Sequence, residues 1–251
     1  MTASPLKEQY DRDGFVVVRD FLPVEEFNEL QNQLDFYIRE IVPTLPDSDA
    51  FYHDKSRTET LKQLQHMKHH PFFANYHEHP RWRELATELI GEPCDAKDPE
   101  WFNKPRGTDH PTPPHQDNFY FCLRPANVLT MWLALDHVDA ENGCLRYVRG
   151  SHLEGIRPHL KTRVLGFSQG IFDYGPDDEA REVEMHLAPN DLIVHHGETI
   201  HRAEANRSSA RDRRAFAMVF RGESCVRDEE AFSRYEASMN SQHCEMGLAT
   251  T

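Results

Sequence analysis

The sequence predicts a mainly β protein, an antiparallel barrel or double-sheet jelly roll with helices gathered at its N-terminal end. From about residue 100 onward, short apolar or alternating runs are separated by Gly, Pro, Asn and Asp, and no helical pattern intervenes. The amphipathic helical patterns lie mainly before residue 91. No internal repeat, low-complexity linker or boundary divides the 251 residues, so we expect a single domain over 1–251.

The N-terminal part is expected to form one strand and two main helices. Residues 14–20 are a β-branched run between Gly14 and Pro23, typical of a strand. Apolar residues then recur every three or four positions over 24–41, which predicts a helix that ends before Pro43. A second helix is expected over 80–90, with Gly91 at its end. Between them, residues 61–65 indicate a short helical turn.

Seven strands are expected in the second part of the chain, followed by a tail. The tail after Val226 carries Phe232, Tyr235 and Met239 amid charged residues and is expected to form a surface helix that frays. The predicted strands cover residues 101–104, 115–123, 128–137, 144–148, 182–187, 191–196 and 215–221.

Charge and cysteine content exclude several classes of protein. Lys and Arg number 28 against 42 Asp and Glu, giving a net charge of −14, and no basic block could follow a phosphate backbone, which argues against a nucleic-acid partner. The start shows no charged-then-apolar leader, and no apolar stretch is long enough to cross a bilayer. Five cysteines without a CxxC pair do not suggest disulfides. We therefore expect a cytoplasmic protein that does not span a membrane.

A histidine and a carboxylate two residues apart are the main chemical signal. If His115 and Asp117 lie in an extended segment, their side chains point to the same side. His201 follows the predicted strand 191–196 and a turn-prone glycine, so a barrel could bring it to the same place. Two histidines and one carboxylate form the facial triad of non-haem Fe(II) oxygenases. An HxD pair by itself also arises by chance on protein surfaces.

Three arginines follow His201 and could hold the carboxylate of a co-substrate. Arg211, Arg213 and Arg214 stand just before the predicted strand 215–221. A guanidinium grips a carboxylate through two parallel hydrogen bonds and stays charged, although an arginine at a strand start is commonly a solvated rim residue. The spacing does not choose among the three.

Other histidines and an aromatic residue have simpler explanations. His195 and His196 could be ligands, but neighbours in a strand point to opposite faces, so at least one is expected to be structural. Trp132 is by default a core aromatic residue. A second metal site is conceivable in the His-rich segment before residue 80, but a polar face beside a helix is the simpler explanation. That segment contains His66, His69, His70, His77 and His79.

Several linked motifs resemble the phytanoyl-CoA dioxygenase family in order and spacing, over about residues 8–222, with 223–251 as a tail. They are Asp13-Gly14-Phe15-Val16-Val17, Phe102-Asn103-Lys104-Pro105, His115-Gln116-Asp117-Asn118-Phe119-Tyr120-Phe121, Arg124-Pro125, Trp132, Glu141-Asn142-Gly143-Cys144-Leu145, Gly150-Ser151-His152, Arg157-Pro158-His159, Gly170-Ile171-Phe172-Asp173-Tyr174, and the segment 191–201.

The resemblance implies a double-stranded β-helix, a cupin-like jelly roll, with an assigned site. His115, Asp117 and His201 match the family's iron ligands, and Arg213 matches the 2-oxoglutarate arginine. Further matches to positions that line the co-substrate pocket are Lys62, Gln116 and Trp132. Two departures stand out. Family members can carry a serine two residues after the histidine that matches His201, and this chain has Ala203 there. Family members can also carry an apolar residue three positions before the Asn-Lys-Pro motif, and this chain has Glu100 there.

The expected function is that of an Fe(II)- and 2-oxoglutarate-dependent dioxygenase that uses O2 to hydroxylate a small molecule, with decarboxylation of 2-oxoglutarate to succinate and CO2. The negative charge and Glu100 favour a cationic or zwitterionic substrate over a polyanionic CoA ester. The alternatives are a zinc-dependent hydrolase and a non-catalytic protein that binds 2-oxoglutarate or a metal on the same barrel. The sequence leaves the identity of the substrate and the oligomeric state open.

Overall fold

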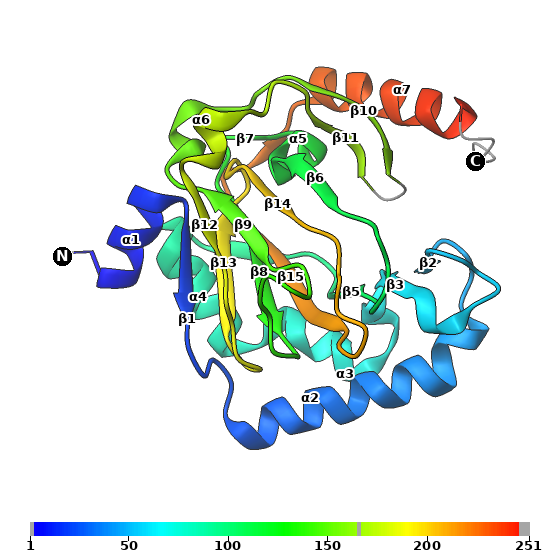
Figure 1. The fold of residues 1–251 in the computed structure, drawn as a ribbon. Coiled ribbons are helices and arrows are strands. Elements are labelled where there is room, and N and C mark those ends of the chain that lie inside the picture. Colours follow the sequence, from blue (N-terminus) through cyan, green and yellow to red (C-terminus); the bar gives the residue numbers. More distant parts are fainter. Residues whose placement is uncertain (1–2, 165–166, 246–251) are drawn as a thin grey trace.

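The computed structural model describes residues 3–164 and 167–245, which form two antiparallel sheets flanked by helices (Figure 1). In the larger sheet the strand order is β1-β13-β8-β15-β5-β3-β2, and β4 also pairs with β15. Its strands are β1 (Phe15–Val18), β2 (Ala50–Tyr52), β3 (Leu61–Leu64), β4 (Cys94–Ala96), β5 (Glu100–Lys104), β8 (Val128–Ala134), β13 (Leu192–His196) and β15 (Arg213–Gly222).

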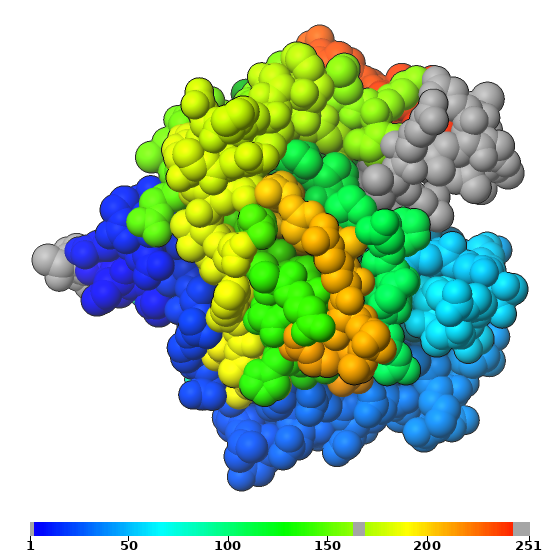
Figure 2. Space-filling model, in the orientation of Figure 1, coloured from blue at the N-terminus to red at the C-terminus, as the bar shows by residue number. Residues whose placement is uncertain are grey.

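The smaller sheet has the strand order β12-β9-β14-β6. It is made of β6 (Thr112–His115), β9 (Leu145–Val148), β12 (Glu182–Glu184) and β14 (His201–Ala203). Two further strand pairs lie outside these sheets, β10 (His159–Val164) with β11 (Phe167–Ile171), and β7 (Leu123–Arg124) with β16 (Val226–Arg227). On the face shown in Figure 2, β9 (green) and β14 (orange) lie side by side in a continuous packed surface.

The helices lie on the outside of this barrel, and most of them come early in the chain (Figure 1). They are α1 (Pro5–Asp13), α2 (Val24–Phe36), α3 (Pro71–Ala74), α4 (Pro80–Ile90), α5 (Asp117–Phe121), α6 (Pro176–Glu179) and α7 (Glu229–Glu245). A π-helical turn covers Tyr37–Ile41, and 3-10 turns cover Val42–Thr44, Thr58–Thr60, Met67–His69, Asn75–Glu78 and Ser151–Glu154. Within the described ranges, no helix is both long and apolar enough to span a bilayer.

The larger sheet separates two hydrophobic cores. Every residue of β8 is buried, because Met131 and its neighbours on one face pack against the helices, while Trp132 on the other face packs inside the barrel. The inner core also holds Tyr147 and Ala203 from the smaller sheet, so the two sheets pack face to face. This arrangement confirms the predicted jelly roll of the double-stranded β-helix type.

Two local predictions are wrong. Residues 115–123 are not one strand, since β6 ends at His115, α5 follows and β7 begins at Leu123. Residues 61–64 belong to strand β3, because pairing with β2 and β5 overrides a weak helical pattern. The helix predicted over 24–41 is present, because α2 continues into the π-helical turn and ends at Ile41, before Pro43.

Candidate active site

Three side chains meet inside the barrel at the end of the smaller sheet. His115 lies at the end of β6, Asp117 at the first position of α5 and His201 at the start of β14, where it pairs with His115. Oδ1 of Asp117 lies 3.5 Å from Nε2 of His115 and 3.6 Å from Nε2 of His201. The three donor atoms lie within 4.8 Å of one another, a spacing that one metal ion could bridge.

Backbone hydrogen bonds orient both imidazoles toward this point. Nδ1 of His115 lies 2.8 Å from the carbonyl oxygen of Pro113, and Nδ1 of His201 lies 3.0 Å from that of Thr199. A carbonyl can only accept, so each Nδ1 carries the proton and each Nε2 keeps its lone pair for a metal. Burial lowers the pKa of His201 well below its usual range, which keeps this ring neutral.

The second carboxylate oxygen of Asp117 is held by two donors from the larger sheet. Thr130 Oγ1 donates to Oδ2 at 2.6 Å, and Nε2 of His195 lies 3.0 Å from the same oxygen. Tyr147 in turn contacts Nδ1 of His195 through its hydroxyl at 2.8 Å. Burial opposes the ionised form of Asp117, but the surrounding imidazoles hold its pKa well below the usual range. His195 therefore supports the carboxylate, and Oδ1 remains directed at His115 and His201.

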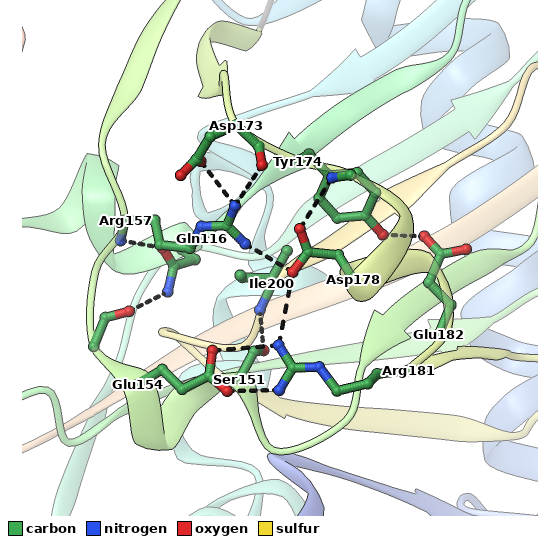
Figure 3. Close-up of polar contacts among 12 residues, drawn as sticks. Gln116, Ser151, Glu154, Arg157, Asp173, Tyr174, Asp178, Arg181, Glu182 and Ile200 are labelled. Atoms are coloured by element: carbon green, nitrogen blue, oxygen red, sulfur yellow. Dashed lines mark hydrogen bonds and ion pairs between the residues drawn. The ribbon is translucent and has the colours of Figure 1, made fainter.

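Gln116 anchors a loop through its side chain, and its expected place in the co-substrate pocket stays a prediction. Its amide nitrogen donates to the carbonyl oxygens of Gly155 and Glu198. Its Oε1 accepts from the backbone N–H of Arg157 (Figure 3). The side chain is fully buried, and both amide hydrogens are used. Gln116 thus fixes the backbone between the two ligands His115 and Asp117.

The motifs around residues 150–182 form a scaffold for the same region. The Arg157 guanidinium bonds to Asp173 and Asp178, and Ser151 Oγ accepts from the backbone N–H of Ile200, next to His201 (Figure 3). Gly14 also supports this end of the barrel. Its φ is +83°, and a Cβ there would lie 2.5 Å from Thr199 Oγ1.

Arg213 is a buried cation inside the barrel. Its residue is 5% exposed, and its guanidinium carbon lies 5.1 Å from the centroid of the Trp132 ring. Nη1 donates to the carbonyl oxygen of Gly143 at 3.0 Å, while Nε is buried without a partner. Among the described residues, no carboxylate lies within ion-pair distance of it. Burial lowers the pKa of Arg213 to about 10.

The neighbouring arginines are already paired. Arg211 bonds to Asp139 and Glu141, and Arg214 bonds to Asp136 at 2.8 Å. Both lie on the rim outside the barrel interior, at the surface pocket that they share with Asp136. The structure thereby distinguishes Arg213 from the two other candidates.

Two lysines add to the positive charge at this end of the barrel. Lys104, opposite Arg213 in the register of β5 and β15, is buried and donates to the carbonyl oxygen of His110. Burial and the charge of Arg213 lower the pKa of Lys104 well below its usual range. Burial also lowers the pKa of Lys62 in β3 to about 8. Arg213, with Lys104 opposite it, forms a site whose positive charge would attract a dianion.

A cavity of about 250 Å³ opens beside the ligands. It is bounded by β5, β8, β15, α5 and α7 and reaches His115 and Asp117. Glu100 lies in its wall, and Gln63 Nε2 donates to its carboxylate at 3.1 Å. Burial raises the pKa of Glu100 to about 7. Tyr235 of α7 also lines the cavity, so the C-terminal helix is part of the site and is more than a fraying surface helix.

The His-rich segment before residue 80 forms no second centre in the described part of the chain. His66 pairs with Asp49, His77 with Asp98 and His79 with Glu26. These histidines face separate carboxylates, and no group of three possible metal ligands gathers there among the described residues. The simpler interpretation as a polar face agrees with this arrangement.

Comparison with known proteins identifies the family. The profile of the family "Phytanoyl-CoA dioxygenase (PhyH)" matches residues 10–215, most of the chain. The chain belongs to the phytanoyl-CoA dioxygenase family. A probable phytanoyl-CoA dioxygenase from Caenorhabditis elegans is 26% identical over 218 residues, which cover 79% of this chain and 69% of that protein. As a family member, the protein is a non-haem iron, 2-oxoglutarate-dependent dioxygenase that acts on a small molecule.

Solved structures share the fold of this phytanoyl-CoA dioxygenase family member. EvdO2 from Micromonospora carbonacea var. aurantiaca, complexed with 2-oxoglutarate, is 24% identical with a TM-score of 0.71, and the match covers 90% of this chain and 93% of EvdO2. The epimerase SnoN, in complex with Fe3+, alpha ketoglutarate and nogalamycin RO, is also 24% identical, with a TM-score of 0.69 and coverage of 88% and 84%.

Three residues near the site in this dioxygenase are not indicated by the sequence. Thr130 and Lys104 lie in strands whose inward face only folding defines, and Tyr235 comes from a distant helix. His195 was a candidate, but its contact with Asp117 depends on the pairing of β13 with β8. Strand parity, with Thr130 two residues before Trp132, is the one signal that could have revealed Thr130.

Proposed function

We propose that this dioxygenase hydroxylates its substrate at an iron held by His115, Asp117 and His201. Bound Fe(II) supplies the activation of O2, coupled to decarboxylation of 2-oxoglutarate to succinate and CO2. The donor set suits this ion, because two neutral imidazoles and one carboxylate on one side of a metal leave positions open for a co-substrate. Zinc would accept the same ligands, but a zinc hydrolase needs no buried arginine beside them.

The observation that carries the proposal is the unpaired guanidinium of Arg213. A buried arginine without an acid is costly unless a ligand supplies the negative charge. The far carboxylate of 2-oxoglutarate is such a group, and a planar guanidinium can bind it through two hydrogen bonds. Trp132 would contact this end of the co-substrate, and Lys62 and Lys104 would add positive charge.

The protein's own groups would orient the reactants and exclude water. Pro113 and Thr199 fix the imidazole tautomers, and Thr130 and His195 fix the carboxylate of Asp117. We further propose a single catalytic domain, a cytoplasmic location and a small cationic or zwitterionic substrate. The net charge of −14 and the carboxylate of Glu100 in the cavity wall support a substrate that carries a positive charge.

An anaerobic titration tests the proposed metal and co-substrate. Metal-free protein is titrated with Fe(II) and 2-oxoglutarate, and the visible charge-transfer band of a chelated keto acid is recorded. We expect a band that is absent in His115→Ala and weakened in Arg213→Ala. The absence of a band in the unsubstituted protein, together with tight zinc binding, would overturn the proposal.

A further inference from the structure

The cavity beside the metal ligands contains two opposite charges that are not paired with each other. Glu100 and Lys97 both line it, yet no ion pair within 4 Å joins them. Glu100 accepts one hydrogen bond from Gln63, and Nζ of Lys97 lies 4.0 Å from the centroid of the Phe121 ring. In the described ranges neither has an ion-pair partner. Each charge is therefore available to a ligand in the cavity.

The third charged group of the cavity wall is already engaged. Asp98 pairs with Lys68 at 2.9 Å and lies 3.4 Å from Nε2 of His77. The remaining wall combines aromatic and small side chains, with Phe102 and Tyr120 beside Ala217. Glu100, Lys97 and an apolar surface thus face the same partly open cavity, with Lys97 on its exposed side.

The size and charge of this space restrict what can enter. About 250 Å³ lies below the range of typical drug-sized ligand pockets. With iron and 2-oxoglutarate bound, the charges of the ion, Asp117, the dianion and Arg213 would cancel, so Glu100 would decide which charge is favoured in the adjacent cavity. A positive group beside Glu100 would be favoured.

We propose that the substrate is a small amino-carboxylic acid, with its ammonium group at Glu100 and its carboxylate at Lys97. The assignment rests on the proposed function, because the cavity is a substrate site only if iron and 2-oxoglutarate occupy the adjacent ligands. Charged hydrogen bonds at both ends would fix which C–H bond faces the metal. Glu100 stands where family members can carry an apolar residue, so this recognition would be a property of this chain.

The test measures succinate release with a defined panel of probes. The panel contains the twenty protein L-amino acids, their N-acetyl derivatives, their carboxamides and a fatty acyl-CoA. We expect at least one free amino acid to stimulate succinate release and its N-acetyl and carboxamide forms to be poor. Glu100→Gln should raise the KM for that amino acid about 10- to 100-fold and abolish discrimination against the N-acetyl form. Lys97→Met should abolish discrimination against the carboxamide.

Glu40→Gln is the control, since it removes an exposed acid that is paired with Arg39 and lies outside the cavity. It should change the KM less than about threefold. The inference is overturned if no amino acid stimulates turnover, if the acyl-CoA or N-acetyl forms work equally well, or if Glu100→Gln behaves like Glu40→Gln. The charge-transfer band separates the two proposals: a normal band without any amino-acid response refutes only the substrate, whereas a missing band refutes the proposed function.

Discussion

At the scale of single residues, Arg213 has the clearest expected effect. Arg213→Met should raise the KM for 2-oxoglutarate about 10- to 100-fold, because it removes a charged, two-fold hydrogen bond inside a dry pocket. Initial rates of succinate formation at varied 2-oxoglutarate measure this. Arg211→Gln is the control, since Arg211 is paired with Asp139 and Glu141 on the rim. An equal rise in both variants would argue against a specific role for Arg213.

His195 is a positioning residue for Asp117. His195→Phe keeps a ring of similar size but removes the contact with Oδ2, so Asp117 would be less firmly oriented. We predict about 10- to 100-fold weaker Fe(II) binding and a shifted charge-transfer band. Anaerobic titration with Fe(II) provides both readouts. If His195 only stabilises the fold by packing, His195→Phe should lower the Tm and leave the affinity for Fe(II) unchanged. That result would contradict the prediction.

The pH dependence of substrate binding should follow Glu100. Burial raises its pKa to about 7, so the group is mostly protonated at pH 6 and mostly ionised at pH 8. Only the ionised form attracts an ammonium group, and hence the KM for an amine substrate should fall as the pH rises through about 7. The profile of kcat/KM between pH 6 and 8 measures this. In Glu100→Gln the slope should disappear, and a retained slope would assign the titration to another group.

At the scale of elements, the segment that carries the HxD motif is not the strand that its composition predicts. Residues 115–123 are rich in aromatic residues, yet α5 interrupts them directly after Gln116. The backbone N–H groups of Gln116 and Asn118 bond to His159 and to the carbonyl oxygen of Gly197, so distant segments pull this stretch out of the sheet. Asp117 reaches the metal ligands from the start of a helix. The side chains of His115 and Asp117 do point to the same place, as expected, but the turn into α5 brings them there and not a continuous strand.

The free energy of unfolding and the affinity for Fe(II) should both depend on the loop that Gln116 anchors. Gln116→Ala leaves three partly buried backbone groups without their partner, so we predict a loss of about 1–3 kcal/mol in the free energy of unfolding. Fe(II) affinity should fall as well, because the neighbours of Gln116 are both ligands. Urea unfolding and Fe(II) titration of the same variant measure the two effects. Asn32→Ala on the exposed side of α2 is a neutral control, and equal stability of both variants would refute this account.

At the scale of the whole molecule, the outer core joins the helices to the larger sheet. Phe216 of β15 is fully buried and packs against the rings of Trp82, Tyr76 and Phe73. Phe216→Ala should therefore cost about 3–5 kcal/mol of unfolding free energy. Phe172→Ala, at a residue 60% exposed, should cost less than about 0.5 kcal/mol. Urea unfolding of both variants tests this, and similar midpoints would contradict the two-core description.

The sequence by itself determined the class of fold, the early helices, most central strands and the candidates for the metal site. These follow from local periodicity, from turn residues and from motifs whose order along the chain is specific to a family. Periodicity also located β8 and β13, because apolar runs of this length are buried in any sheet that contains them.

Only the tertiary structure decided which candidates share one site. Strand pairing separated Arg213 from Arg211 and Arg214, brought His195 and Thr130 to Asp117, and turned Gln116 toward a loop. The C-terminal helix contributed Tyr235 to a cavity that is also lined by residues far earlier in the chain, such as Gln63 and Phe102. The physical reason is that register and sheet order depend on long-range pairing and burial, which no local pattern of residues encodes.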